Sequence, residues 1–211
     1  MLKESTTLVD LWTFIPTCFA LNLAFGPNNL LSITHGAQRG IGFAAAAGAA
    51  RLAAFVPMIL ASALGLGALL SVSAAAFNVL KVLGALYLIY LGVRLLIGGV
   101  RPKPPEEVDP VSLREAMRSE GTVALTNPKA ILIFTAFFPQ FVAVDHYWLS
   151  YVIVAGLFLV FEGVAIALYA ALGRLARAFI ATRLHWLQRV SGVGMMVFGG
   201  LLLFAKQPAR L

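Results

Sequence analysis

Two short polar segments, one in each half of the chain, combine a proline with side-chain amides. The first is Gly26-Pro27-Asn28-Asn29 and the second is Thr126-Asn127-Pro128-Lys129. Proline at the first helical position, with Gly or Asn just before it, is typical of a helix start. Each segment therefore predicts a break after which a new helix begins. The free N–H groups at such a helix end carry partial positive charge and attract a carboxylate or phosphate.

Polar side chains around the breaks extend this predicted anion site. The amides of Asn28, Asn29 and Asn127 and the ammonium of Lys129 would supplement the helix ends. Asn22 lies about one helical turn before the first break, so it would face the same cavity. The alternative is that both prolines are plain kinks healed by neighbouring helices. Two breaks at matching places in the two halves favour a transporter's binding site.

Two charged residues lie inside long apolar runs. Arg51 lies in the second predicted helix and Glu162 in the fifth, helices that correspond in the two halves, so the two residues would form an ion pair. The pair would lock two helices together, or Glu162 would carry a coupling proton; both roles stay open. Lys81 would line the pathway or extend to the outer interface. Tyr87 would line the pathway or anchor its helix at the interface.

The composition places all these residues in a membrane protein. Of 211 residues, 60% are hydrophobic and 12% are charged, and the mean hydropathy is +0.89, unlike a soluble globular domain. About 20 apolar residues are needed to cross about 30 Å of hydrocarbon as a helix. Runs of that length predict six helices, at residues 11–34, 41–70, 74–97, 121–144, 147–172 and 185–205.

The predicted fold is all-α, with six transmembrane helices in a 3+3 inverted repeat whose first and fourth helices are broken by proline. A polar, proline-rich connector at residues 99–120 separates half one (8–98) from half two (121–205) of a single transmembrane domain. An odd number of helices per half inverts the second half in the membrane. Superposing the two prolines pairs the first helix with a charged stretch before residue 127. Half two would then begin with an amphipathic or re-entrant segment.

The net charge of +7 does not indicate nucleic acid, because the basic residues are spread singly among helix ends. They concentrate in the connectors after the first, third and fifth predicted helices. By the positive-inside rule these connectors are cytoplasmic, so both termini are predicted outside. The basic residues in question are Arg39, Arg94, Arg101, Lys103, Arg114, Arg118, Arg174, Arg177, Arg183 and Arg189.

Residue spacing offers no support for an enzyme, a metal site or a cofactor. His35, His146 and His185 are expected in three different connectors, without metal-ligand spacing. Ser32 lies one turn from His35, but no oxyanion-hole motif accompanies the two. No nucleotide-binding glycine motif is present. Cys18 is the single cysteine, so no intramolecular disulfide can form.

Small residues line several predicted helix faces, at residues 42–50, 84–92 and 192–200. In lipid, such faces let helix backbones approach closely. They would pack helices within the bundle, or one of them would form the seam of a homodimer.

An ordered set of short motifs runs along residues 11–205. The motifs are Phe25-Gly-Pro-Asn-Asn-Leu-Leu, His35-Gly36, Arg39-Gly40-Ile-Gly42, Leu64-Gly65-Leu66, Leu80-Lys81, Gly84-Ala85-Leu-Tyr87-Leu, Leu91-Gly92, Asn127-Pro128-Lys129-Ala130 and Phe138-Pro139-Gln140-Phe141. Together they resemble the LysE/RhtB family of bacterial inner-membrane exporters of amino acids and their derivatives. The resemblance implies a multi-pass inner-membrane protein that exports a small amino acid by proton antiport. It also implies a substrate-binding role for both breaks and a pathway or gate role for Gln140.

Departures from the family pattern bear on the substrate. The family's first break usually reads Pro-Gly-Pro, whereas this chain has Phe25-Gly26-Pro27. Many members place an acidic residue soon after the proline and another in the second helix, where this chain has Asn28 and Arg51. This loss of negative charge argues against a cationic substrate. The Asn-Asn pair is similar to a branch that handles small neutral amino acids such as cysteine derivatives.

The expected mechanism is alternating access of the two halves around the bound amino acid. Its carboxylate would sit at the two helix starts, and proton uptake by Glu162 would relieve its contact with Arg51. The rival interpretations are a non-transporting membrane scaffold or assembly protein and a passive channel. A one-sided cavity at the breaks would favour the transporter, a continuous pore the channel, and a solid interior the scaffold.

Overall fold

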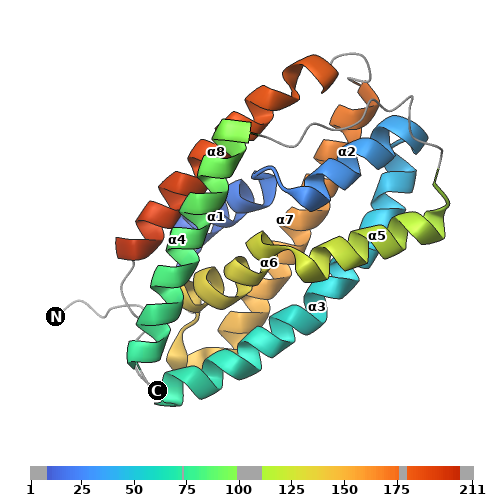
Figure 1. Ribbon diagram of the computed structural model, residues 1–211. Coiled ribbons are helices and arrows are strands. Elements are labelled where there is room, and N and C mark those ends of the chain that lie inside the picture. The colour runs from blue at the N-terminus through green and yellow to red at the C-terminus, as the bar shows by residue number, and fades with distance from the viewer. Residues whose placement is uncertain (1–8, 73, 99–110, 176–179, 205–211) are drawn as a thin grey trace.

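The computed structural model describes residues 9–72, 74–98, 111–175 and 180–204, and every element within these ranges is helical (Figure 1). The α-helices are α1 (Leu11–Leu23), α2 (Pro27–Arg39), α3 (Ile41–Val72), α4 (Ala74–Gly98), α5 (Leu113–Thr126), α6 (Pro128–Leu132), α7 (Tyr147–Leu175) and α8 (Ile180–Phe204). After α6 the chain continues through a π-helical turn, η2 (Ile133–Phe137), and two 3-10 turns, η3 (Phe138–Phe141) and η4 (Val144–His146). The all-α prediction is confirmed for this part of the chain.

Helices cover each of the six predicted apolar segments, but they differ in length. Within the described ranges, two helices are long and apolar enough to cross a membrane unaided, at Ile41–Gly65 and Tyr147–Leu175. The pair Leu113–Thr126 and Pro128–Phe141, bent by 48°, would make a third span if taken together. The apolar helix α1 is shorter than a span. The arrangement of six spans as an inverted repeat stays a prediction.

A helix occupies the end of the predicted connector, where the sequence also predicts an amphipathic or re-entrant start of half two. The sequence predicts a connector up to residue 120, whereas α5 begins at Leu113. Ser112 and Glu115 form a capping box, in which the Ser112 hydroxyl accepts from the Glu115 N–H and the Glu115 carboxylate accepts from the Ser112 N–H. The buried positions Ala116 and Glu120 recur at helical spacing, so this polar stretch is an amphipathic helix. The connector residues 99–110 lie outside the described ranges.

Helices α4 and α8 lie side by side, and the glycines of their shared face explain why (Figure 1). A Cβ atom at Gly92 would come within 2.5 Å of the Gly192 carbonyl oxygen. A Cβ atom at Gly199 would come within 2.8 Å of the Ala85 carbonyl oxygen. Only glycine allows backbones to approach this closely. The prediction that small residues pack helices within the bundle is confirmed for this pair.

Helix α2 is held against α7 in the same way. A Cβ atom at Gly36 would collide with the Ala170 backbone, and one at Gly173 would collide with the Ile33 backbone. Helix α3 packs on both α5 and α7. These contacts bring α2, α3, α5 and α7 together around one point in the interior.

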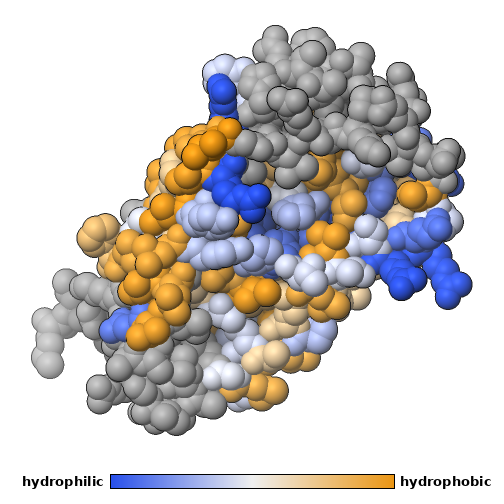
Figure 2. Space-filling model, viewed as in Figure 1, coloured by the Kyte–Doolittle hydropathy of each residue, from blue (hydrophilic) through white to orange (hydrophobic). Residues whose placement is uncertain are grey.

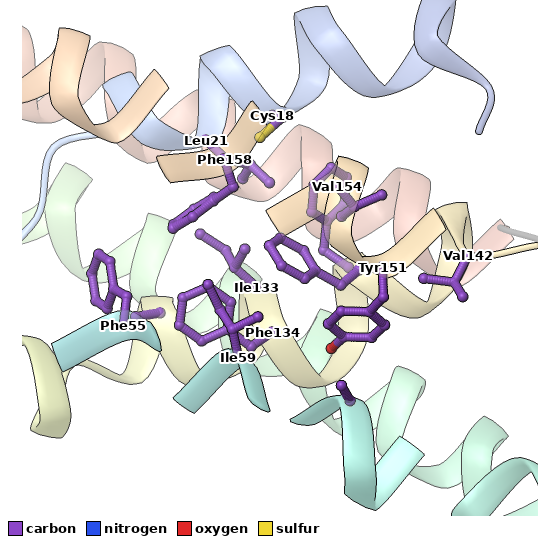
Figure 3. Close-up of a cluster of buried hydrophobic side chains, with 14 of the residues drawn as sticks. Cys18, Leu21, Phe55, Ile59, Ile133, Phe134, Val142, Tyr151, Val154 and Phe158 are labelled. Carbon is purple, nitrogen blue, oxygen red and sulfur yellow. The ribbon is translucent and has the colours of Figure 1, made fainter. Parts of the chain in front are cut away.

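A hydrophobic core rich in aromatic rings packs between α3, α7 and the turn η2 (Figure 3). The ring centroid of Phe134 is 5.4 Å from that of Phe55 and 5.1 Å from that of Phe158, so helices α3 and α7 meet the turn η2 here. Many large hydrophobic side chains are exposed, and on the face that Figure 2 shows, hydrophilic residues gather at the end where α5 begins and also in the middle of the face. An apolar outer surface of this kind is expected where a helical protein contacts lipid.

Candidate functional site

Arg51 of α3 is fully buried and is shared between two carboxylates. Its Nε lies 2.9 Å and its Nη2 lies 2.8 Å from Glu120 Oε2, while its Nη1 lies 2.8 Å from Glu162 Oε1. Glu120 comes from α5 and Glu162 from α7. One guanidinium therefore links three helices, and removing it would leave two buried charges without their cation.

The same guanidinium also binds the beginning of α2. Its Nη2 donates to the Asn28 carbonyl and to Ser32 Oγ, both at 2.6 Å. Its Nη1 donates to Asn29 Oδ1 at 3.3 Å. Arg51 thus ties the first break to both carboxylates.

At the first break, α1 ends at Leu23 and α2 begins at Pro27. Gly26 is the N-cap, in an extended conformation with φ of −159°, and it has no side chain with which to cap the helix. The predicted helix start is confirmed. Pro27 itself is exposed and contributes its fixed φ rather than a contact.

The carbonyls at the end of α1 are bound by Lys129 and Asn29. Lys129 Nζ donates to the Ala24 carbonyl at 2.8 Å and to the Leu21 carbonyl at 3.2 Å. Asn29 Nδ2 donates to the Ala24 carbonyl at 2.9 Å and to the Asn22 carbonyl at 3.1 Å. The ammonium therefore sits at the negative end of α1, where helix carbonyls lack partners within the helix.

At the second break, Asn127 caps the helix that follows it. Its Oδ1 accepts from the Lys129 N–H at 3.0 Å, and Pro128 occupies the first helical position, as predicted. Its Nδ2 donates to Asn28 Oδ1 at 2.9 Å. Asn28 in turn donates to the carbonyl and the Oε2 of Glu120 at 3.1 and 3.2 Å. The two breaks, far apart in sequence, therefore contact each other directly.

The expectation that the breaks lack carboxylates is wrong. Sequence places only amides and Lys129 beside them, but α5 brings the buried Glu120 onto Asn28. Glu120 was not among the predicted site residues. The sequence does contain a signal for Glu120, because it lies four residues from both Ala116 and Ala124 and so shares one helix face with them. An acidic residue on a face of small apolar residues is buried with that face and requires a partner for its charge.

Two of the three histidines, His35 and His185, lie in helices rather than in the expected connectors. His35 lies inside α2 rather than in a connector, is buried, and has its Nδ1 3.6 Å from Glu120 Oε1. His185 falls within α8, where its side chain lies outside the described residues, and His146 ends the turn η4. No group of three or more His, Cys, Asp or Glu side chains suited to a metal ion occurs among the residues that the structure describes.

The remaining predicted site residues lie at varying distances from this centre. Asn22 is buried, and its Nδ2 donates to the Cys18 carbonyl at 2.8 Å. Tyr87 is exposed on α4, where its ring centroid lies 5.7 Å from that of Tyr90. Gln140 is half-buried in η3 and donates to the Ala136 carbonyl at 3.3 Å. The side chain of Lys81 lies outside the described residues.

A surface pocket of about 460 Å³ lies at the C-terminal end of α2. It is lined by Gly36, Ala37, Gln38, Arg39, Gly40 and Arg174. Gly40 ends α2 with φ of 86°, a left-handed conformation that favours glycine. None of the break residues lines this pocket.

Buried charged residues at two broken helices, within a bundle of long apolar helices, define a class of membrane protein that binds and moves solutes. The chain matches the LysE type translocator family over residues 19–206, and it belongs to that family. It is 36% identical over 179 residues to an uncharacterized membrane protein of Pseudomonas aeruginosa, an alignment covering 76% of this chain and 82% of that protein.

Two further relatives carry a functional name. The chain is 30% identical over 209 residues to the leucine efflux protein of Salmonella typhimurium, covering 97% of this chain and 95% of that protein. It is 34% identical over 141 residues to the leucine efflux protein of an Enterobacter species, covering 65% and 66%. No solved structure matches the chain. Family and relatives together support amino-acid export by a transmembrane protein.

Proposed function

We propose that this chain exports a small neutral amino acid across the bacterial inner membrane in exchange for protons. Leucine is the first candidate, because the leucine efflux protein of Salmonella typhimurium aligns with almost the whole chain. The observation that carries the proposal is the charge balance at the breaks. The site buries two cations, Arg51 and Lys129, and two carboxylates, Glu120 and Glu162; Arg51 pairs with both carboxylates, and Lys129 binds the carbonyls of α1. Because these charges balance, the site would not bind an amino acid with a cationic side chain more tightly than one with a neutral side chain.

The neighbourhood of the cluster also suits an apolar substrate side chain. Phe55 lies one helical turn from Arg51 on α3, and Phe158 lies one turn from Glu162 on α7. Both rings belong to the hydrophobic core between α3, α7 and η2. A neutral amino acid bound at the cluster would extend its side chain toward these rings and gain by leaving water.

The substrate's two charged groups would use the break residues. Its carboxylate would bind at the helix starts formed by Gly26, Pro27, Asn28 and Asn29 in half one and by Asn127 and Pro128 in half two. Its ammonium would take the carbonyls at the end of α1, beside Asn22, that Lys129 now binds. Lys129, released from them, would then pair with the substrate carboxylate.

Alternating access would act through the contacts between the halves. Arg51, Asn28 and the carbonyls of α1 belong to half one, whereas their partners Glu120, Glu162, Asn127 and Lys129 belong to half two. Proton uptake by Glu162 would weaken one of these contacts and shift the balance between two states. The pairing of α3 with α7 and of α4 with α8, which are equivalent helices in an inverted repeat, supports this scheme. Both termini would lie outside the cell.

Efflux of labelled leucine from loaded proteoliposomes, with an acidic exterior, tests the proposal. The wild type should release leucine faster with the pH gradient than without it. Glu162→Gln should lose that acceleration, and Asn28→Ala combined with Lys129→Ala should lose efflux. Glu115→Gln, which removes an exposed charge of α5 while the Gln side-chain oxygen can still accept from the Ser112 N–H in the capping box, is the control.

Each alternative gives a different result. Unchanged acceleration in Glu162→Gln would refute the proton role, and unchanged efflux in the double variant would refute the binding site. A passive channel would release leucine without any effect of the gradient, and a membrane scaffold would release none.

A further inference from the structure

Two buried polar atoms face each other without a hydrogen-bond partner. His35 Nδ1 and Glu120 Oε1 are 3.6 Å apart, and neither forms a hydrogen bond. His35 is 3% exposed and Glu120 is 0% exposed, so water does not satisfy them readily. A buried polar group without a partner costs about 1–3 kcal/mol. One proton between the two atoms would turn this gap into a charge-assisted hydrogen bond.

The other oxygen of Glu120 is already committed. Oε2 accepts from Arg51 Nε at 2.9 Å and from Asn28 Nδ2 at 3.2 Å. Oε1 is therefore the oxygen at which Glu120 can gain a proton while these contacts remain in place. His35 is the titratable side chain that faces this oxygen.

The other charged groups around the pair come from each element packed against it. Helix α3 contributes Arg51, α7 contributes Glu162 through that guanidinium, and Lys129 of α6 is bound to the carbonyls of α1. The charged side chains that share the helices of the pair are exposed; they are Arg39 on α2, which lies over the Phe43 ring, and Arg114, Glu115 and Arg118 on α5.

We propose that His35 and Glu120 form a second proton-binding site, whose occupation weakens the contact of Arg51 with α5. One proton is bound by forming an O–H bond at Glu120 Oε1 or an N–H bond at His35 Nδ1, and it is released by breaking that bond. When Glu120 is neutral, Arg51 keeps Glu162 as its only carboxylate. Helix α5 then loses its ionic contact with α3, while α7 keeps its own.

This inference rests on the proposed function and adds to it a division of roles. Glu162 and Glu120 hold the same guanidinium from different helices, so protonating one or the other favours a different set of helix contacts. A transporter that exchanges substrate for protons needs such a difference between two states. The pair of His35 and Glu120 would supply this difference between the two states at α5, the helix that ends at the second break.

The pH dependence of leucine efflux tests the pair, because a merely structural role would not change it. The readout is the ratio of efflux rates at about pH 5 and about pH 8, the range in which histidine side chains ordinarily change charge. Glu120→Gln and His35→Gln should each change this ratio by about threefold or more. Glu115→Gln should leave it unchanged. Glu120→Asp keeps a carboxylate and should restore part of the dependence if Glu120→Gln folds poorly.

A second readout does not require transport. The difference in thermal unfolding temperature between wild type and Glu120→Gln, measured in detergent, should vary over the same pH range, whereas the difference for Glu115→Gln should stay constant. If the wild type transports no leucine, the proposed function is refuted. The unfolding measurement then still tests whether His35 and Glu120 bind a proton. The proposal of a proton-binding site would be overturned by either of two results. One is a difference in unfolding temperature between wild type and Glu120→Gln that stays constant with pH; the other is a ratio of efflux rates in Glu120→Gln equal to that of the wild type.

Discussion

The two proline breaks use different partners to satisfy their helix ends. At the second break, the side chain of Asn127 caps α6 itself. At the first break, Gly26 has no side chain, and the carbonyls at the end of α1 are bound by Asn29 and by Lys129 from the other half of the chain. The helix start at the second break is thus capped by its own residue, whereas the helix end at the first break is bound partly by a residue from the second.

This difference indicates which contacts change when the halves move apart. Separation would uncover the carbonyls of α1 and the ammonium of Lys129 at the same time. These are the complementary groups that an amino acid's ammonium and carboxylate require. The second break would keep its own cap throughout.

The largest expected effect follows from removing the guanidinium that joins both breaks to α7. Arg51→Met leaves Glu120 and Glu162 buried without their cation and should cost about 3–5 kcal/mol of stability. Thermal unfolding in detergent, followed by size-exclusion chromatography, measures it. Arg118→Met, which removes an exposed cation from α5, should change little. An Arg51→Met protein as stable as the wild type would show that the cluster does not hold the breaks together.

A smaller effect should separate the two breaks from each other. Lys129→Met removes the ammonium from the carbonyls of α1 and should cost about 1–3 kcal/mol. Asn127→Ala removes a cap, for about 1 kcal/mol. Hydrogen exchange should show faster opening at the end of α1 in Lys129→Met and at the start of α6 in Asn127→Ala. If both variants showed the same pattern of hydrogen exchange, the conclusion that the first break depends on a residue of the second, while the second caps itself, would be contradicted.

The smallest effect tests whether the first break can be given its own cap. Gly26 is extended, and a Cβ there would meet only the flexible end of Lys129, at 3.5 Å. Gly26→Ser should therefore be tolerated and should stabilise α2 by a few tenths of a kcal/mol, roughly, through a new N-cap. Combined with Lys129→Met, it should leave the exchange at the end of α1 fast, because the new cap serves α2. Protection of α1 in the double variant would show that the two helix ends are coupled.

Local chemistry made both breaks predictable from sequence. The pairs Gly26-Pro27 and Asn127-Pro128 determine backbone angles and caps within a few residues, so the helix starts at Pro27 and Pro128 required no knowledge of the fold. Arg51 and Glu162 were expected to be neighbours because their helices correspond in the two halves, and the structure brings the two side chains into contact. Their roles in transport stay predictions.

Long-range packing determined what sequence could not show. Glu120 reaches Asn28 because α5 begins earlier than its hydropathy suggests and turns its small face, with Glu120 on it, toward α3. Lys129 was visible as a charge near a helix start, but its partners are carbonyls of α1, which only the fold brings near. His35 was assigned to a connector because the length of α2 after the break was underestimated.

The central claim is that the contacts between the first and second breaks part and re-form during transport. Arg39 Nη1 donates to the Val111 carbonyl at 3.1 Å, which places the end of α2 beside the residues before α5, away from the cluster. Arg39→Cys with Val111→Cys can be joined there by a short bis-maleimide, and the buried Cys18 does not compete for the reagent. Leucine efflux should stop on cross-linking and persist in each reagent-treated single variant. Efflux at the uncross-linked rate from fully cross-linked protein would contradict the account.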